Sequence, residues 1–192
     1  MRLEVKSVKG IVLIGPPCCG KSTICGILCN KLGKYAYISS GDIARKMTQG
    51  NTEAMASLNA GNMAPEDEMR SRVINEIYSC IKRGEDFILD GFPRNMDQVK
   101  YLMECGICLQ YIKLVVSDDV IIRRAKSRMR SDDVSVMKRL KYYKENTEPI
   151  IHHVGDYGVT LVMCGDAEYD AYKVHKTIQR MEGLIHADDC EV

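Results

Sequence analysis

The segment that most constrains the fold covers residues 10–23 and reads GIVLIGPPCCGKST. It starts with an apolar run over residues 11–14, which is typical of a strand buried on both faces. A loop bounded by Gly15 and Gly20 follows, and after Lys21 the apolar residues recur at helical spacing. This spacing is that of a P-loop, in which backbone N–H groups and the positive end of a helix bind phosphates. A chance match is the alternative, but strand and helix are both in register, so we expect the chain to bind nucleoside phosphates.

Length and charge restrict the class of protein. The 192 residues suit one domain with a substantial core. Charged residues balance to a formal net charge of +1, which argues against a general nucleic-acid binder. No apolar run approaches the roughly 18 residues of a membrane span, and the N-terminus lacks the apolar core of a signal peptide. We therefore expect a cytoplasmic protein that binds neither nucleic acid nor membranes.

The nine cysteines do not form a pattern typical of secreted proteins. Their number is odd and their spacing does not repeat, which argues against a disulfide framework. Cys105 and Cys108 have the spacing of half a zinc site, but no second pair and no histidine lie near them. We expect reduced thiols that pack as small hydrophobic side chains, and no zinc.

Strand and helix patterns alternate along the chain. Besides residues 11–14, strands are expected at 35–38, 87–90, 109–116 and 159–163. Besides the helix after Lys21, helices are expected at 42–60 (in two pieces broken at 50–51), 65–83, 95–104, from 118, 134–153 with a bend at Pro149, and 169–185. This alternation predicts an α/β fold with a mainly parallel sheet, helices on both faces, and ligands at the carboxyl ends of the strands.

Charged residues indicate where chemistry takes place. Asp90 ends the strand at 87–90, where a carboxylate can organise Mg²⁺ beside a P-loop, although Asp before Gly is also common in turns. Five arginines lie close together in one region, and two more lie near glycine-containing loops: Arg123, Arg124, Arg128, Arg130 and Arg139, with Arg45 and Arg94. A solvated basic helix face is the alternative. Beside a P-loop, however, guanidinium groups suit phosphate oxygens and the charge that develops in phosphoryl transfer.

Phosphoryl transfer between two phosphates places specific demands on a protein. The acceptor is already an anion, so neutralisation, alignment and exclusion of water matter more than a general base. Two inserted segments, 40–69 and 127–135, are the candidates for lids that exclude water.

Five segments together resemble the adenylate kinase family of nucleoside monophosphate kinases, in its short-lid type. They cover residues 15–23, 39–45, 90–94, 130–133 and 142–150, and the Asp-Gly-Phe-Pro-Arg of 90–94 is specific by itself. The resemblance extends over about residues 10–185. It implies a P-loop NTPase-type, five-stranded parallel sheet covered by helices on both faces, in one domain. Its implied parts are a core (1–39, 70–126, 136–192), a segment that binds the nucleoside monophosphate (40–69) and a short lid (127–135).

The reaction implied by the resemblance is the reversible, Mg²⁺-dependent transfer of the γ-phosphoryl group of ATP to AMP, giving two ADP, by a monomeric enzyme. The implied catalytic residues are Lys21, Arg94, Arg128, Arg130 and Arg139. Those implied for ATP are Gly15, Pro16, Pro17, Cys18, Cys19, Gly20, Lys21, Ser22, Thr23, Arg124 and Ala167. Those implied for AMP are Ser40, Arg45, Asn62, Met63, Ala64, Gly91, Phe92, Pro93, Arg94, Gln98, Arg130 and Arg139. Ser22 and Asp90 would hold Mg²⁺ through water.

The choice of substrate depends on fewer residues. Gln98 carries an amide that can pair with the N1 and N6 edge of adenine, and the related uridylate-cytidylate kinases typically have Asn there and Ala in place of Ser40. Asn95, by contrast, is shared with those pyrimidine kinases. A kinase for UMP and CMP is therefore one alternative.

Three features depart from the pattern of the family. Cys18 and Ser22 stand where the family has or usually has glycine, and the lid is too short and lacks the cysteines of the zinc-bearing long-lid type. In the loop, a side chain at position 18 would crowd the backbone or the phosphates. A nucleotide-binding sensor that has lost turnover is the second alternative, and Cys18 is the feature that supports it.

Overall fold

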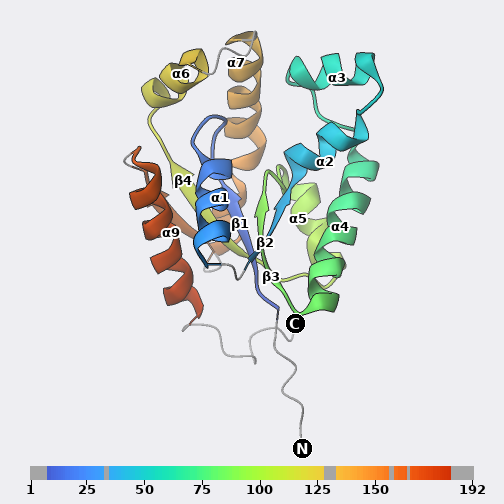
Figure 1. The fold of residues 1–192 in the computed structure, drawn as a ribbon. Coiled ribbons are helices and arrows are strands. Elements are labelled where there is room, and N and C mark those ends of the chain that lie inside the picture. Colours follow the sequence, from blue (N-terminus) through green and yellow to red (C-terminus); the bar gives the residue numbers. More distant parts are fainter. Residues whose placement is uncertain (1–7, 33–34, 128–132, 156–157, 164, 183–192) are drawn as a thin grey trace, which may run out of the picture.

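The structure, a computed structural model, describes residues 8–32, 35–127, 133–155, 158–163 and 165–182. Strands and helices alternate along most of these residues (Figure 1). In chain order the elements are β1 (Gly10–Ile14), α1 (Lys21–Leu32), β2 (Tyr35–Ser39), α2 (Ser40–Met47), α3 (Thr52–Asn59), α4 (Glu66–Arg83), β3 (Asp86–Asp90), α5 (Met96–Glu104), β4 (Gln110–Val115), α6 (Asp118–Ser127), α7 (Asp133–Tyr142), η1 (Tyr143–Thr147), α8 (Ile150–His153), β5 (Gly158–Val162) and α9 (Ala167–Glu182). None of the helices in these ranges is long and apolar enough to cross a membrane.

The five strands form one parallel sheet in the order β2-β3-β1-β4-β5. The central strand β1 pairs with β3 on one side and β4 on the other, so that Ile11 lies between Ile88 and Gln110. Because all strands run in the same direction, their carboxyl ends meet at one edge, which is where an open parallel sheet binds ligands. The predicted five-stranded parallel sheet is confirmed.

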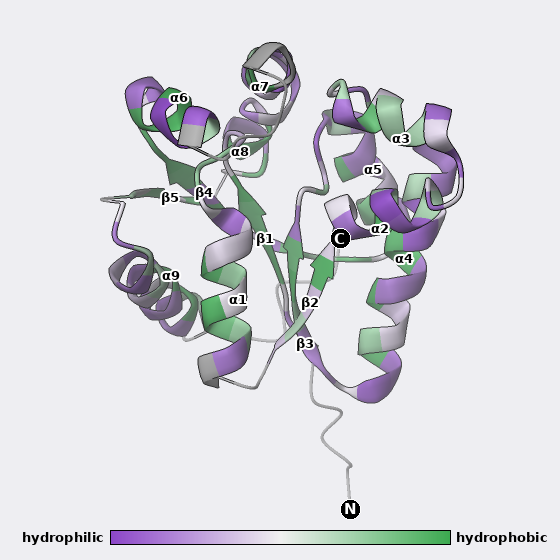
Figure 2. Cartoon of the chain, turned by 45° about the horizontal axis from the view of Figure 1, so that its top comes forward, coloured by the Kyte–Doolittle hydropathy of each residue, from purple (hydrophilic) through white to green (hydrophobic). Residues whose placement is uncertain are grey.

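The alternating side chains of β1 divide the core into two clusters. Val12 and Ile14 pack in a cluster that includes buried residues of α4, α5 and α8. Ile11 and Leu13 pack in a second cluster, with buried residues of α1 and α9. A strand buried on both faces has to be apolar throughout, which explains the continuous run of four apolar residues. Helices α4 and α9 turn their hydrophobic sides to the sheet and their polar sides outward, as Figure 2 shows, and buried residues of α1 and α9 on one face and of α4 and α5 on the other confirm the predicted cover on both faces.

Side-chain caps fix where the helices next to the sheet edge begin. Ser39 accepts a hydrogen bond from the Asp42 N–H at 3.1 Å at the start of α2. Asn95 accepts one from the Gln98 N–H at 2.9 Å at the start of α5. Each cap pairs an N–H group that a helix leaves without an intrahelical partner. The loops that precede these helices are therefore held in defined positions.

The helix predicted over 134–153 with a bend at Pro149 is present as α7, η1 and α8, with the interruption between η1 and α8 at Pro149 and a π-helical turn before it that was not predicted. The α-helical bonds end at Tyr142, and η1 is a π-helical turn in which the Glu148 N–H donates to the Tyr143 carbonyl at 2.9 Å. Pro149 has no N–H to continue the ladder, and the turn before it widens. Tyr143 and Thr147 are both buried in this turn. The apolar spacing of the sequence does not show that these two side chains face the core together.

Candidate active site

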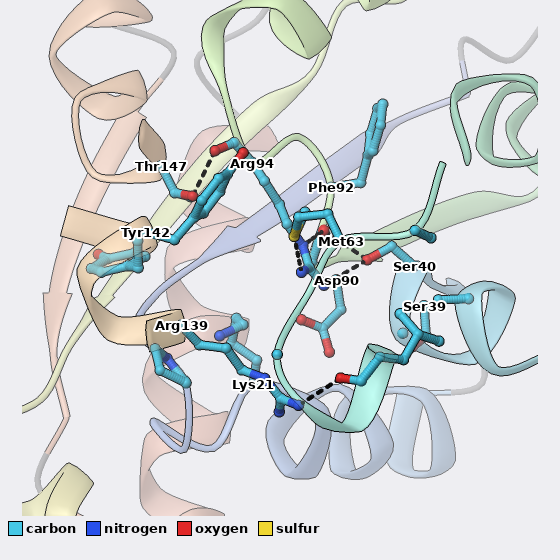
Figure 3. A pocket seen from close by; sticks show the side chains of 18 of the residues that line it. Lys21, Ser39, Ser40, Met63, Asp90, Phe92, Arg94, Arg139, Tyr142 and Thr147 are labelled. Atoms are coloured by element: carbon cyan, nitrogen blue, oxygen red, sulfur yellow. Dashed lines mark hydrogen bonds between the residues drawn. The ribbon is translucent and has the colours of Figure 1, made fainter. Parts of the chain in front are cut away.

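A cavity of about 700 Å³ lies at the carboxyl ends of β1, β2 and β3 (Figure 3). Most of the predicted site residues line it: Gly15, Pro17, Cys18, Lys21, Ser22, Ser40, Arg45, Asn62, Met63, Ala64, Asp90, Gly91, Phe92, Pro93, Arg94, Gln98 and Arg139. Six others lie outside its lining: Pro16, Cys19, Gly20, Thr23, Arg124 and Ala167. Two predicted lid residues, Arg128 and Arg130, lie outside the residues that the structure describes. The cavity therefore brings together the loop between β1 and α1, the segment from α2 to the start of α4, the loop after β3, α5, and the stretch from α7 to η1.

The loop between β1 and α1 wraps around the ammonium group of Lys21. Its Nζ donates to the Gly15 carbonyl at 2.7 Å and to the Pro16 carbonyl at 3.0 Å. The Cys19 N–H closes the loop by donating to the Pro16 carbonyl at 3.4 Å. A cation is thus held at the N-terminus of α1, where the helix dipole also favours an anion.

Cys18 adopts a backbone conformation that side chains disfavour. Its φ is +60°, and it is the one non-glycine residue with positive φ in the described part of the chain. In this left-handed region the Cβ crowds the following carbonyl, at a cost of roughly 1 kcal/mol. The conformation explains why a glycine would suit this position, and it persists here with a cysteine whose side chain lines the cavity.

Asp90 is held at the end of β3 by two hydroxyl groups. The Ser22 Oγ and the Tyr37 phenol each donate to its Oδ2 at 2.9 Å. Burial and the negative charge of Asp90 both raise the pKa of Tyr37, so the phenol keeps the proton that it donates. The hydroxyl and carboxylate oxygens of Ser22 and Asp90 are the hard donors that suit a hydrated Mg²⁺.

Arg94 is anchored in the loop that follows β3. Its Nε donates to the Gly91 carbonyl at 2.6 Å, and its Nη2 donates to the Ser40 Oγ at 3.3 Å. The Ser40 hydroxyl in turn donates to the Gly91 carbonyl at 2.6 Å. From the other side, the Thr147 hydroxyl of η1 donates to the Arg94 carbonyl at 2.7 Å. Burial lowers the pKa of the Arg94 guanidinium and the nearby Asp90 carboxylate raises it, which marks a charge held away from water.

Gln98 lies in the wall of the cavity with 1% of its surface exposed. Its Oε1 accepts the backbone N–H of Arg94 at 2.7 Å, and its Nε2 donates to Glu66 Oε1 at 2.9 Å. Glu66 also accepts a hydrogen bond from Arg70 Nε at 2.9 Å. The amide is therefore bonded on both sides within the fold.

Two other arginines lie at opposite sides of the site. Arg124 donates to the Cys19 carbonyl at 2.8 Å and to the Gly165 carbonyl at 3.3 Å, so it connects the phosphate loop with the turn before α9. Arg45, with 57% of its side chain exposed, forms an ion pair with Asp42 on the same helix. Both remain within reach of solvent next to the cavity.

Arg139 connects the two segments that stand at the carboxyl edge of the sheet. From α7, its Nη2 donates to the carbonyls of Leu58 and Asn59, at 3.2 Å and 3.5 Å, at the end of α3. Lys138 donates to the Asn62 side chain in the same region. Figure 1 shows α3 and α7 at the same end of the molecule, and these bonds close the space above the cavity.

Sequence reasoning missed three residues of this site: Tyr37, Glu66 and Thr147. Tyr37 lies in an apolar strand pattern, Glu66 in the acidic first turn of a helix, and Thr147 in a helical stretch. Each has an ordinary structural explanation in its local sequence. Their partners lie 53, 32 and 53 positions away, so no local signal identifies them.

The family model and the individual proteins that this chain resembles belong to the same family. The family model "Adenylate kinase" matches residues 13–159. An adenylate kinase of Corynebacterium glutamicum is 36% identical over 169 residues, which cover 82% of this chain and 92% of that protein. The adenylate kinase of Mycolicibacterium smegmatis is 35% identical over 157 residues (76% and 86%), and that of Prochlorococcus marinus 31% over 171 residues (82% and 92%).

Proposed function

The chain belongs to the adenylate kinase family, and from that premise we propose that it transfers the γ-phosphoryl group of ATP reversibly to AMP, giving two molecules of ADP. The observation that carries the proposal is the arrangement of Lys21, Arg94 and Arg139 around one cavity, each from a different element (Figure 3). Three cations that face one space suit the negative charge of two nucleotides that exchange a phosphoryl group.

We assign the two nucleotides to opposite sides of the cavity. The P-loop residues 15–23 and Lys21 would bind the phosphates of ATP, with its adenine against Arg124 and near Ala167. The hydrogen bonds of Arg124 to the P-loop and to Gly165 support this position, because they place a flat cation between the two segments. Lys21 would exchange its carbonyl partners for phosphate oxygens when ATP binds.

AMP would occupy the side formed by α2, the α3–α4 connection and the loop after β3. Its phosphate would lie near Arg45, Arg94 and Arg139, and its base near Gln98. Residues 62–64, Ser40 and 91–93 would complete the walls. Support for this assignment comes from the half-buried Arg94, whose guanidinium already has carbonyl and hydroxyl partners and is therefore fixed before a ligand arrives.

The chemical step needs alignment rather than a general base. An AMP phosphate oxygen would attack the γ-phosphorus of ATP as the bond from that phosphorus to the β-phosphate oxygen breaks. The former AMP and the former ATP are then both ADP. Arg94 and Arg139 would orient the acceptor and stabilise the charge on the transferring group. Arg128 and Arg130, by resemblance to the family, would close over the same group from the lid.

Mg²⁺ would accompany ATP, with Ser22 and Asp90 holding it through water. Bound there, the ion neutralises negative charge on the phosphates and fixes their orientation. Tyr37 and Ser22 keep the Asp90 carboxylate turned in one direction through their hydrogen bonds to Oδ2.

The inserted segments would act as covers over the bound nucleotides. We propose residues 40–69 and 127–135 as the moving parts and the remaining ranges as the core. The bonds from Arg139 to the end of α3 support contact between the two sides of the site. We propose a monomer as the working unit, by resemblance to the short-lid members of the family.

A coupled assay tests the proposal directly. Mg·ATP is supplied with AMP, UMP, CMP or GMP in the presence of a reductant, and ADP formation is followed. Rapid turnover with AMP alone is expected. Turnover with UMP and CMP instead would contradict the choice of substrate, and binding of ATP without turnover on any acceptor would contradict the activity itself.

A further inference from the structure

The amide of Gln98 is fixed in one orientation by two partners of opposite kind. The Arg94 backbone N–H can only donate, so the carbonyl oxygen of the amide must face it. The Glu66 carboxylate accepts in its ionised form, so the amide nitrogen must face it. A flip of the amide would oppose donor to donor on one side and acceptor to acceptor on the other. The two bonds together leave one N–H and one lone pair of the amide for a ligand.

This orientation decides which purine edge the amide can read. Adenine presents an acceptor at N1 and a donor at N6, whereas hypoxanthine and guanine present a donor at N1 and an acceptor at O6. An amide that turns freely satisfies either edge, because exchanging its oxygen and nitrogen reverses the pattern. An amide that cannot turn satisfies one edge and meets the other with two unfavourable contacts, which cost more than lost bonds.

Glu66 is itself held in position by Arg70 of its own helix, which in turn contacts the neighbouring helix α5. Arg70, one turn further along α4, donates to the same Oε1 at 2.9 Å, and its guanidinium lies 5.5 Å from the centre of the Tyr101 ring on α5. Gln98 and Tyr101 are on the same helix. The carboxylate is therefore part of a contact between α4 and α5 and lines the cavity next to the amide.

We propose that Glu66 is a specificity-determining residue that excludes 6-oxopurine nucleotides by holding the Gln98 amide in the orientation that accepts adenine. This inference rests on the proposed function, in which Gln98 faces the base of AMP. Glu66 acts through Gln98, so it positions the amide and takes no part in the transfer of the phosphoryl group.

The test is the preference for AMP over IMP in Glu66→Gln. A glutamine at position 66 can donate or accept, so it removes one of the two constraints on the Gln98 amide with almost no change in shape, and the Arg94 N–H retains the other. Equilibrium binding of AMP and of IMP is measured by calorimetry, together with kcat/KM for each. We expect the preference for AMP to fall about tenfold, mainly through better binding of IMP, as ATP affinity stays unchanged.

Glu68→Gln is the matched control, since Glu68 forms the same kind of pair with Arg72 on α4 with about half of each side chain exposed. It should leave the preference unchanged. Glu66→Ala serves as a second variant if Glu66→Gln unfolds, and it should move the preference in the same direction. An unchanged preference in a folded Glu66 variant would overturn the proposal. Wild-type protein that bound AMP in preference to IMP but did not turn it over would contradict the proposed function and leave the binding comparison to decide the role of Glu66.

Discussion

The phosphate loop and the opposite side of the cavity are held together over very different distances along the chain. In the loop, Lys21 bonds to carbonyls six and five positions away. On the opposite side, the bond from Ser40 to Gly91 spans 51 positions and that from Gln98 to Glu66 spans 32. The turn around Lys21 is thus closed by local bonds, although Ser22 and Cys19 also bond to Asp90 and Arg124, 68 and 105 positions away. The opposite side is assembled only when α2, α4, α5 and η1 pack together.

The difference predicts how each half responds to mutation. A substitution in the phosphate loop changes mainly the backbone conformation of that loop. A substitution on the opposite side of the cavity disturbs contacts among several segments at once. ATP affinity and AMP affinity should therefore respond separately to variants in the two halves. Four variants test this comparison, from the largest expected effect to the smallest.

Arg94→Lys should have the largest effect. Lysine keeps the charge but loses the flat fork that reaches Gly91 and Ser40, so we expect kcat to fall about 10³-fold. ATP affinity should stay within about twofold, because the P-loop is intact. Rapid kinetics with AMP and separate ATP titrations measure the two quantities. Equal losses in both would contradict the assignment of Arg94 to the AMP side.

Gly91→Ala should weaken AMP binding by about tenfold or more and destabilise the fold by about 2 kcal/mol. The φ of Gly91 is +78°, and a Cβ there would lie 2.5 Å from Ser40 Oγ and 3.1 Å from Arg94 Nη2. Gly84→Ala is the control for backbone strain, because its φ is +66° and a Cβ would meet nothing within 4 Å. Calorimetry with AMP and thermal unfolding compare the two. If both variants lost AMP affinity equally, crowding at Ser40 and Arg94 would not be the cause.

Thr147→Val should lower kcat/KM for AMP by about fivefold, since the Arg94 carbonyl loses its hydroxyl partner without a change in side-chain shape. Thr177→Val removes a comparable bond, from Thr177 to the Lys173 carbonyl at 2.9 Å within α9. This control should lower the free energy of unfolding but leave kcat/KM for AMP unchanged. Steady-state kinetics with varied AMP separate them, and the same kinetic loss in both variants would refute a positioning role for Thr147.

Cys18→Gly should have the smallest effect and the opposite sign. Glycine relieves the left-handed conformation, so we expect the free energy of unfolding to rise by about 1 kcal/mol, with a modest gain in ATP affinity. Cys18→Ala removes the thiol but keeps the Cβ, so it should not be stabilised. Denaturant unfolding of the three proteins gives the comparison, and a gain in the alanine variant would attribute the effect to the thiol instead of the backbone.

Much of the fold and part of the site follow from local patterns. The continuous apolar runs predict strands buried on both faces, Gly84 ends α4 as the sequence indicates, and the P-loop spacing locates the N-terminus of α1 at the cavity. The π-helical turn at Tyr143–Thr147, just before the predicted bend at Pro149, was not predicted, because the apolar spacing of a helical stretch does not show where one turn widens. The roles of Arg128 and Arg130 stay predictions, since both lie outside the described residues.

The sequence by itself determined the order of strands and helices and the loop between β1 and α1, because these depend on side-chain periodicity and on bonds across a few residues. Only the tertiary structure decided that Tyr37 holds Asp90, that Thr147 holds the Arg94 loop and that Glu66 sets the direction of the Gln98 amide. Each of those bonds joins residues at least 32 positions apart. Such partners meet only after the helices have packed on the sheet, because their closeness comes from the burial of apolar faces elsewhere in the chain.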